Sequence, residues 1–248
     1  MTAAGKLAKL DRMFLCCLTR LESTEDCCGI EHFLEEDGEC SLVDLATWEK
    51  KNAPYVLPAD LKAFYAHFNG LRLSYRAEIG GKLVKVGEMC LNKLEAITRV
   101  ALEGTFPKMG WPKSVGAAEN KPCSQSDPFV LDLKSSAAFS IDSSLEIGDV
   151  VLLYRCLDDS SAGRSKSAAF NHYSDPEVWF QDISARWHFV SASFTNFLRL
   201  MVSHLGVYGW QLAYSPEGLP PETIHWMGLF CKERICIDEN AIKRRQQS

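Results

Sequence analysis

The feature that most constrains this chain is a helix pattern followed directly by a strand pattern, in residues 57–86. The helix pattern of residues 57–70 has Pro58 at its start, where a helix needs no N–H donor, and an Asn-Gly pair at its end, where the backbone can turn left-handed. Residues 71–79 then alternate apolar and polar side chains, which is the period of a half-buried strand. Gly80-Gly81 is a hairpin turn signal, and residues 82–86 read as the returning strand. The pattern predicts a helix beside an antiparallel hairpin.

The rest of the chain continues this mixture of helices and strands. Two stretches rich in Pro, Gly or Ser, 104–128 and 157–175, are predicted to be loops. The first expected elements are a short helix over 91–102 and strands over 138–141 and 150–154. An aromatic hairpin is expected over 177–182 and 186–190. It is followed by a helix capped by Ser193 or Thr195 and stopped by Gly206, and by a short helix over 220–230 with Ile224, Met227 and Phe230 inward. This order predicts an α+β fold, with a central, mostly antiparallel sheet flanked by N- and C-terminal helices.

The N-terminal region has a different character. Leu7, Leu10, Phe14, Cys17 and Leu21 are spaced as one face of an amphipathic helix, which packs either on the chain's own core or on a partner. The expected organisation is this helix and an acidic connector in 1–40, one domain in 41–232, and a short polar and basic tail in 233–248.

Charge is distributed unevenly along the 248 residues. There are 27 Lys and Arg against 32 Asp and Glu, a formal net charge of −5. Residues 21–49 contain ten acidic residues and no Lys or Arg, so the remainder carries +5, since −5 minus −10 is +5. The overall acidity argues against a nucleic-acid binder, which normally has a basic excess.

Neither a membrane nor a metal partner is expected. No apolar run approaches the roughly 20 residues that cross a bilayer, so we expect a soluble intracellular protein. The ten cysteines include two adjacent pairs and no C-x-x-C, a spacing that does not suit zinc, and free buried thiols are predicted. We therefore predict no metal and no cofactor.

No motif for catalysis is present. The chain lacks a glycine-rich phosphate loop, a G-x-S-x-G elbow, an H-E-x-x-H pair and the kinase signatures. His188, His204 and His225 are predicted to be hydrogen-bonded structural residues, and His32 belongs to a solvated acidic face. No catalytic residue is expected.

Two sets of motifs carry a resemblance to known families. Trp48-Glu49-x-x-Asn52 followed by Leu57-Pro58-x-Asp60-Leu61-x-x-Phe64-Tyr65-x-x-x-Asn69-Gly70 resembles the opening signature of the SUKH (Smi/Knr-like) superfamily. The later runs Val86-Gly87-Glu-Met89, Glu177-Val-Trp179-Phe180, Trp187-His188-Phe189, His204-Leu205-Gly206 and Trp210-Gln211-x-Ala213-Tyr214 are similar to the family of non-catalytic second subunits of tubulin polyglutamylase complexes.

The resemblance implies an adaptor rather than an enzyme. It implies partners in the other complex subunits, including a tubulin-tyrosine-ligase-like catalytic subunit, and in tubulin or microtubules. It implies a place in the cytoplasm and cytoskeleton, at the axoneme of a cilium or flagellum or at the basal body or centrosome. The alternatives are an axonemal or cytoskeletal structural protein with the same fold and an immunity-type protein-binding module. The candidate partner-binding residues are Trp179, Trp210, Trp226, Lys243, Arg244 and Arg245.

Overall fold

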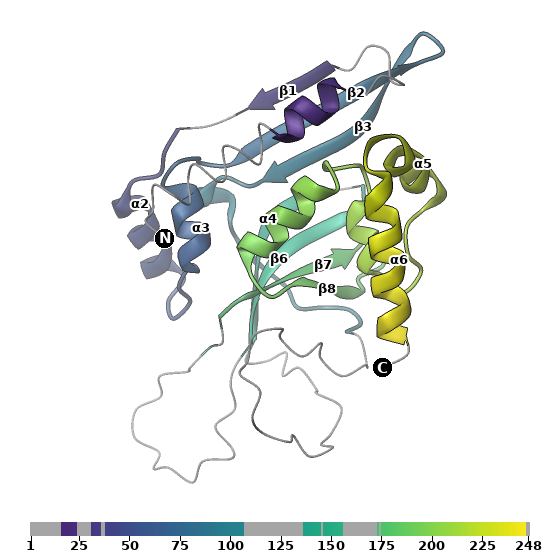
Figure 1. Cartoon of the computed structure of the whole chain (residues 1–248). Helices are drawn as coiled ribbons and strands as arrows, with labels where there is room; N and C mark the ends of the chain where they lie inside the picture. Colours follow the sequence, from purple (N-terminus) through teal and green to yellow (C-terminus); the bar gives the residue numbers. More distant parts are fainter. Residues whose placement is uncertain are drawn as a thin grey trace, which may run out of the picture.

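The computed structural model describes residues 16–23, 31–35, 38–106, 136–144, 146–155, 173 and 175–246. Within these residues the fold is α+β, as predicted, with two antiparallel sheets and helices packed on them (Figure 1). The predicted single sheet is divided in two. The backbone of Asn92 after the first sheet donates to Ile141 of the second at 2.8 Å, so the two sheets adjoin.

The first sheet has the order β1-β2-β3. Strands β2 (Leu71–Ile79) and β3 (Lys82–Leu91) form the predicted hairpin, with Gly80 and Gly81 at φ 56° and 76° in its turn. Strand β1 (Glu31–Glu35) pairs antiparallel with β2. This strand falls within the segment predicted to be an acidic connector, and backbone pairing with β2 orders these five residues although their composition is polar.

The second sheet has the order β4-β5-β6-β7-β8. Its strands are β4 (Arg99–Val100), β5 (Ala137–Ser144), β6 (Gly148–Tyr154), β7 (Glu177–Asp182) and β8 (Trp187–Ser191). The aromatic hairpin is thereby confirmed. The helix predicted over 91–102 is wrong, since only the 3-10 turn η1 (Leu94–Ala96) precedes β4. The Asn69 side chain accepts a hydrogen bond from the backbone N–H of Leu94, and the Trp48 indole donates one to the carbonyl of Ile97. These side chains occupy backbone groups of the segment that was predicted to be helical.

Helices flank both sheets. They are α2 (Leu42–Lys51), α3 (Ala59–Tyr65), α4 (Phe194–Ser203), the 3-10 segment η2 (Trp210–Tyr214), α5 (Pro221–Phe230) and α6 (Lys232–Gln246). Ser193 caps α4 as predicted. The expected tail is instead the helix α6, whose Asp238 is buried. Ile224 of α5 was predicted inward but is exposed, whereas Met227 and Phe230 are buried.

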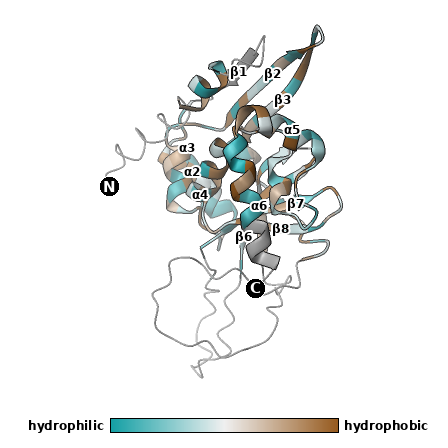
Figure 2. Cartoon of the chain, turned by 45° about the vertical axis from the view of Figure 1, so that its right-hand side comes forward, coloured by the Kyte–Doolittle hydropathy of each residue, from teal (hydrophilic) through white to brown (hydrophobic). Residues whose placement is uncertain are grey.

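Two apolar cores hold these layers together. The larger lies between the sheets and α2 to α5, and it includes Cys17 and Leu21 of a helix at 16–22. These two residues pack on the chain's own core; Leu7, Leu10 and Phe14 lie outside the described residues. In Figure 2 hydrophobic residues continue to the end of the β2–β3 hairpin, where Ile79 is 48% exposed.

The smaller core lies on the other face of the second sheet. It contains Ala138, Val151, Leu153, Trp179 and Trp187. The segment 100–106 crosses this face, and the ring of Phe106 stacks on Trp187 at 5.0 Å. The second sheet is thus covered on both faces, which explains why β6 and β7 are almost continuously buried.

No helix in the described part of the chain is long and apolar enough to cross a membrane. The described thiols are free, and those of Cys17 and Cys231 are buried as predicted. Burial raises the pKa of both thiols to about 12, so they stay protonated and unreactive.

Candidate functional site

A buried carboxylate organises the turn between β7 and β8. Asp182 accepts hydrogen bonds from the backbone N–H groups of Ser184 at 2.8 Å and Arg186 at 3.0 Å, which fixes the turn. Its second oxygen bonds Nε of Arg186 at 2.9 Å and lies 3.0 Å from Nε2 of His188. Burial by itself raises the pKa of Asp182, but the bonds to His188, Arg186 and Ser184 outweigh it and hold the pKa below its usual range. The carboxylate is therefore charged and fully partnered.

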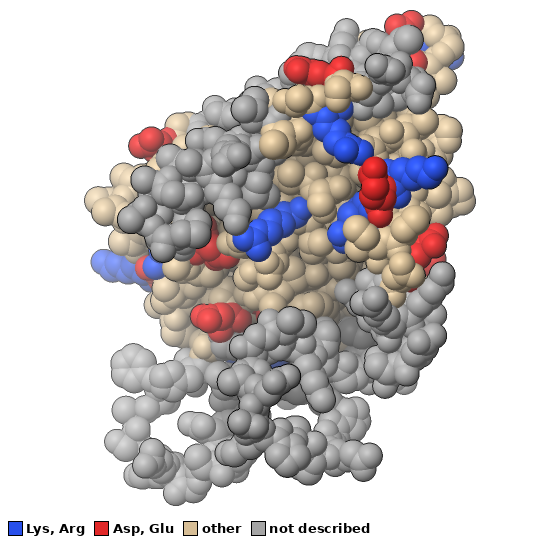
Figure 3. Space-filling model, in the orientation of Figure 1, with Lys and Arg blue, Asp and Glu red and all other residues tan. Residues whose placement is uncertain are grey.

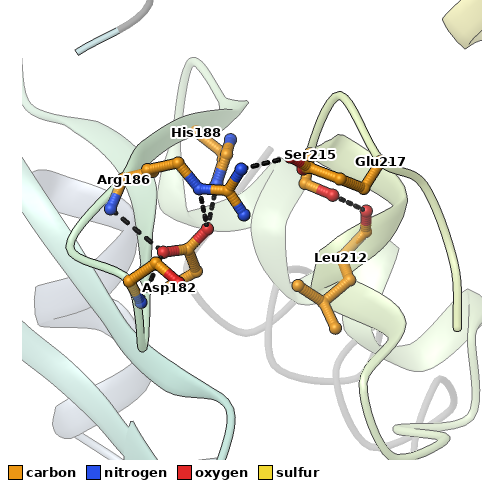
Figure 4. Close-up of polar contacts among 7 residues, drawn as sticks. Asp182, Arg186, His188, Leu212, Ser215 and Glu217 are labelled. Carbon is orange, nitrogen blue, oxygen red and sulfur yellow. Dashed lines mark hydrogen bonds and ion pairs between the residues drawn. The ribbon is translucent and has the colours of Figure 1, made fainter. Parts of the chain in front are cut away.

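Arg186 extends this network to a second element. Its guanidinium also pairs with Glu217, in the loop between η2 and α5 (Figure 4). In the same loop the Ser215 hydroxyl donates to the carbonyl of Leu212 at 2.8 Å. The Arg186 side chain is 39% exposed and Glu217 is 55% exposed, so water screens this outer pair. The network ties the aromatic hairpin to the C-terminal helices.

A second buried pair joins α4 to α6. The ring of His204, which is fully buried, lies 2.7 Å from the carbonyl of Leu200 and 2.8 Å from the carboxylate of Asp238. Arg234 donates to the same carboxylate at 2.5 Å. Because Asp238 is 34 residues from His204, this pair anchors α6 on the domain.

Both pairs are structural in their geometry. For the described residues, the hydrogen bonds of the two rings join them to carboxylates, a main-chain carbonyl and Arg234, with no hydroxyl or thiol nucleophile in reach. The prediction for His188 and His204 is confirmed. His225 is different, because it is exposed on α5 and its ring contacts Trp226 at 5.3 Å.

The three candidate tryptophans are buried. Trp179, Trp210 and Trp226 are 1, 1 and 5% exposed. Trp179 belongs to the smaller core, while Trp210 stacks on His204 with ring centroids 4.7 Å apart. In the folded chain these indoles therefore pack among the chain's own side chains, and their role in binding a partner stays a prediction.

The three basic candidates belong to the last helix, α6. Lys243, Arg244 and Arg245 fall in the last turns of α6, and their side chains are outside the described residues. Elsewhere, Lys and Arg side chains gather in the upper middle of the face in Figure 3, with acidic side chains among them. Opposite charges also pair directly in the described residues, as Arg20 does with Glu233 at 3.2 Å. Charge on this face is therefore mixed.

The acidic segment also meets basic residues within the chain. In the β1–β2 register Glu31 is opposite Arg76, and Glu35 is opposite Arg72. This part of the acidic segment thus lies beside strand β2 of its own domain.

Sequence reasoning missed the carboxylates that hold both networks. Asp182 could have been found, because an Asp two residues before Ser184 in a short turn is typical of side-chain-to-backbone turn bonding. Asp238 carried no local signal, since its partner comes from a distant helix.

The described residues thus define an α+β domain whose motif histidines and tryptophans build its interior. The chain is similar to the protein named tubulin polyglutamylase complex subunit 2 from Rattus norvegicus, with 25% identity over 231 residues, 92% of this chain and 73% of that protein. It is 25% identical to the Mus musculus protein of that name over 190 residues and 27% identical to the Homo sapiens one over 188 residues. The resemblance predicted from the Trp-rich motifs is confirmed.

The matches cover the relatives to different extents. The mouse and human alignments span 75% of this chain but 60 and 59% of those proteins. No family model matches the chain, and no solved structure matches it. The SUKH assignment therefore stays a prediction.

Proposed function

We propose that this protein is a non-catalytic adaptor subunit of a tubulin polyglutamylase complex. In this role it binds other subunits, including a tubulin-tyrosine-ligase-like catalytic subunit, and supports their addition of glutamate chains to tubulin tails. The observation that carries the proposal is the similarity to subunit 2 over 92% of the chain.

The polar networks support an adaptor role. The two His–Asp pairs have their bonds directed to structural partners, and they fix the C-terminal helices against the sheet. A rigid domain of this kind presents its surface without rearrangement, which lowers the entropic cost of binding.

Tubulin contact is proposed for the basic parts of the surface. Tubulin tails are acidic, so we assign this contact to the basic body and to residues 243–245, and not to the acidic segment 21–49. Such binding weakens as salt rises, because exposed charges are screened beyond about 8 Å at physiological ionic strength. The proposed location is the cytoplasm and cytoskeleton, at the axoneme or the basal body or centrosome.

The experiment is purification of the tagged chain from its native cells, with identification of the co-purifying proteins and measurement of tubulin glutamylation after deletion. We expect a tubulin-tyrosine-ligase-like enzyme and further small subunits, and reduced glutamylation. Recovery of the chain without any such enzyme, together with unchanged glutamylation, would contradict the proposal. Recovery in axonemes at fixed stoichiometry with unchanged glutamylation would instead indicate a structural protein.

A matched pair of variants separates assembly from tubulin contact. Reversing the three charges at 243–245 is expected to reduce tubulin binding while the complex still assembles. Ala46→Glu, an exposed change on α2 within the acidic segment, is the control for altering net charge elsewhere.

A further inference from the structure

A groove of about 660 Å³ lies between α2 and the segment 94–99, at the end of the molecule marked by α2 in Figure 1. Its apolar floor includes Trp48, Leu94 and Ile97, which are 6, 4 and 2% exposed. Its walls carry exposed charged residues from α2 on one side and from η1 and β4 on the other. This size falls in the range of ligand-binding clefts, about 300–1,000 Å³.

The charges divide the groove into two ends. Glu39, Asp44 and Glu95 line it near Cys40, where burial first, and then the charges of Asp44 and Glu95, raise the pKa of the Cys40 thiol. Hydrogen bonds from Ser41 hold the pKa of Asp44 below its usual range, so this end is negative at neutral pH.

The opposite end is positive. Lys51 lies in the last turn of α2, and the guanidinium of Arg99 lies over the ring of Tyr55, 5.8 Å from its centroid. From Asp44 to Lys51 is seven helical residues, about 10 Å along the axis. In an extended chain every second side chain lies on the same face, so residues four positions apart share a face and are separated by about 13 Å, which spans this distance.

One wall of the groove is a sheet edge. Among the described strands, β4 pairs with β5 alone. The carbonyl of Thr98 accepts from Ser140 of β5, so the peptide groups of Arg99 point the other way in an antiparallel ladder. Ile97 is two residues before Arg99, so its peptide groups point to the same side as those of Arg99. The carbonyl of Ile97 accepts a hydrogen bond from the Trp48 indole at 3.0 Å. The outward side of this segment therefore faces α2 and the groove.

We propose that this groove binds an extended segment of a partner protein that adds to the edge of β4. The segment runs antiparallel to β4, as do all the strand pairs within the two described sheets. Because β4 runs from the acidic end to the basic end, the bound segment places an Asp or Glu against Lys51 and Arg99. Four positions later, on the same face of the strand, it places a Lys or Arg against Glu39, Asp44 and Glu95. Backbone bonds to Arg99 supply β-strand addition, and the charges set the direction. This inference does not depend on the proposed function.

The test uses the full-length protein and two fluorescein-labelled octapeptides of threonine and valine. One carries a glutamate followed four positions later by a lysine, and the other carries the two charges exchanged. Fluorescence anisotropy at low salt measures binding, and the Trp48 indole N–H signal in NMR reports whether the groove is occupied. We expect the first peptide to bind more tightly and to shift that signal.

Charge variants make the test specific. Glu95→Lys is expected to weaken the first peptide about fivefold, about 1 kcal/mol. The double variant Glu95→Lys with Arg99→Glu is expected to lose most of the preference between the two peptides, because the acidic end falls from three negative charges to a net one and the basic end from two positive charges to none. Lys50→Glu, on the same helix but outside the groove, is expected to leave both affinities unchanged. Circular dichroism confirms that each variant is folded.

Three outcomes would overturn the proposal. The first is that the wild-type chain binds neither peptide. The second is that it binds both equally. The third is that the double variant keeps the wild-type preference at full strength, which would show that the charges of the groove do not set the direction.

Discussion

Replacing Asp182 by asparagine tests the claim that one buried carboxylate holds the β7–β8 turn to the C-terminal helices. The Asp182 side chain is 3% exposed and bonds two backbone N–H groups, Arg186 and His188. Asparagine keeps the shape but removes the charge and turns an amide N–H₂ toward donors. Breaking a buried ion pair from one side costs about 3–5 kcal/mol. Because the Arg186 side chain is 39% exposed, water screens its share and we expect the lower end, about 3 kcal/mol.

Thermal and urea unfolding followed by circular dichroism measure this cost. A loss of about 3 kcal/mol lowers Tm by roughly 6–12 °C in a chain of this size. The matched control is Glu217→Gln at the exposed end of the same network, which is expected to cost less than about 1 kcal/mol. If Asp182→Asn is as mild as Glu217→Gln, the carboxylate does not hold the turn and the reasoning fails.

The same substitution has a pH signature. A carboxyl whose pKa is lowered on folding stabilises the protein above its unfolded pKa, about 3.9, and this contribution is lost as pH falls through the folded pKa. The stability difference between wild type and Asp182→Asn is therefore expected to shrink as pH falls below about pH 4. A difference that persists undiminished well below pH 4 would contradict the assignment.

Three further predictions concern other parts of the chain. Burial raises the pKa of Asp142 to about 7, so its ionisation destabilises the folded protein as pH rises. Asp142→Asn should therefore stabilise the protein by on the order of 3 kcal/mol at pH 8 and by little near pH 4. Urea unfolding at the two pH values measures this difference. Gly148→Ala should lower the free energy of unfolding by more than about 3 kcal/mol, because φ is 132° and a Cβ would lie 2.0 Å from the carbonyl oxygen of Gln181. The control is Gly228→Ala in α5, where a Cβ meets no other atom. This change should leave the free energy of unfolding unaltered or raise it by up to about 1 kcal/mol. Charge reversal at 243–245 should lower microtubule co-sedimentation and flatten its salt dependence, and undiminished, salt-sensitive binding would remove these residues from the contact.

The sequence by itself determined the elements whose signals are local. The helix and hairpin of 57–86, the aromatic hairpin, and the cap and stop of α4 depend on side-chain period and on turn residues within a few positions. Those interactions form between neighbours in the chain, so they can be predicted before any tertiary contact is known. The Trp-rich motifs likewise sufficed for the resemblance to tubulin polyglutamylase complex subunit 2.

The tertiary structure decided what depends on distant partners. It pairs the acidic segment of β1 with β2, and it replaces the helix expected over 91–102 because Trp48, 49 residues from Ile97, takes a backbone carbonyl there. It joins His204 to Asp238, and it buries tryptophans that the sequence left open as surface contacts. Burial and pairing between remote residues depend on how the chain packs, and local composition contains no information about that geometry. The groove beside β4 is visible for the same reason only in the folded molecule, where α2 and a sheet edge come together.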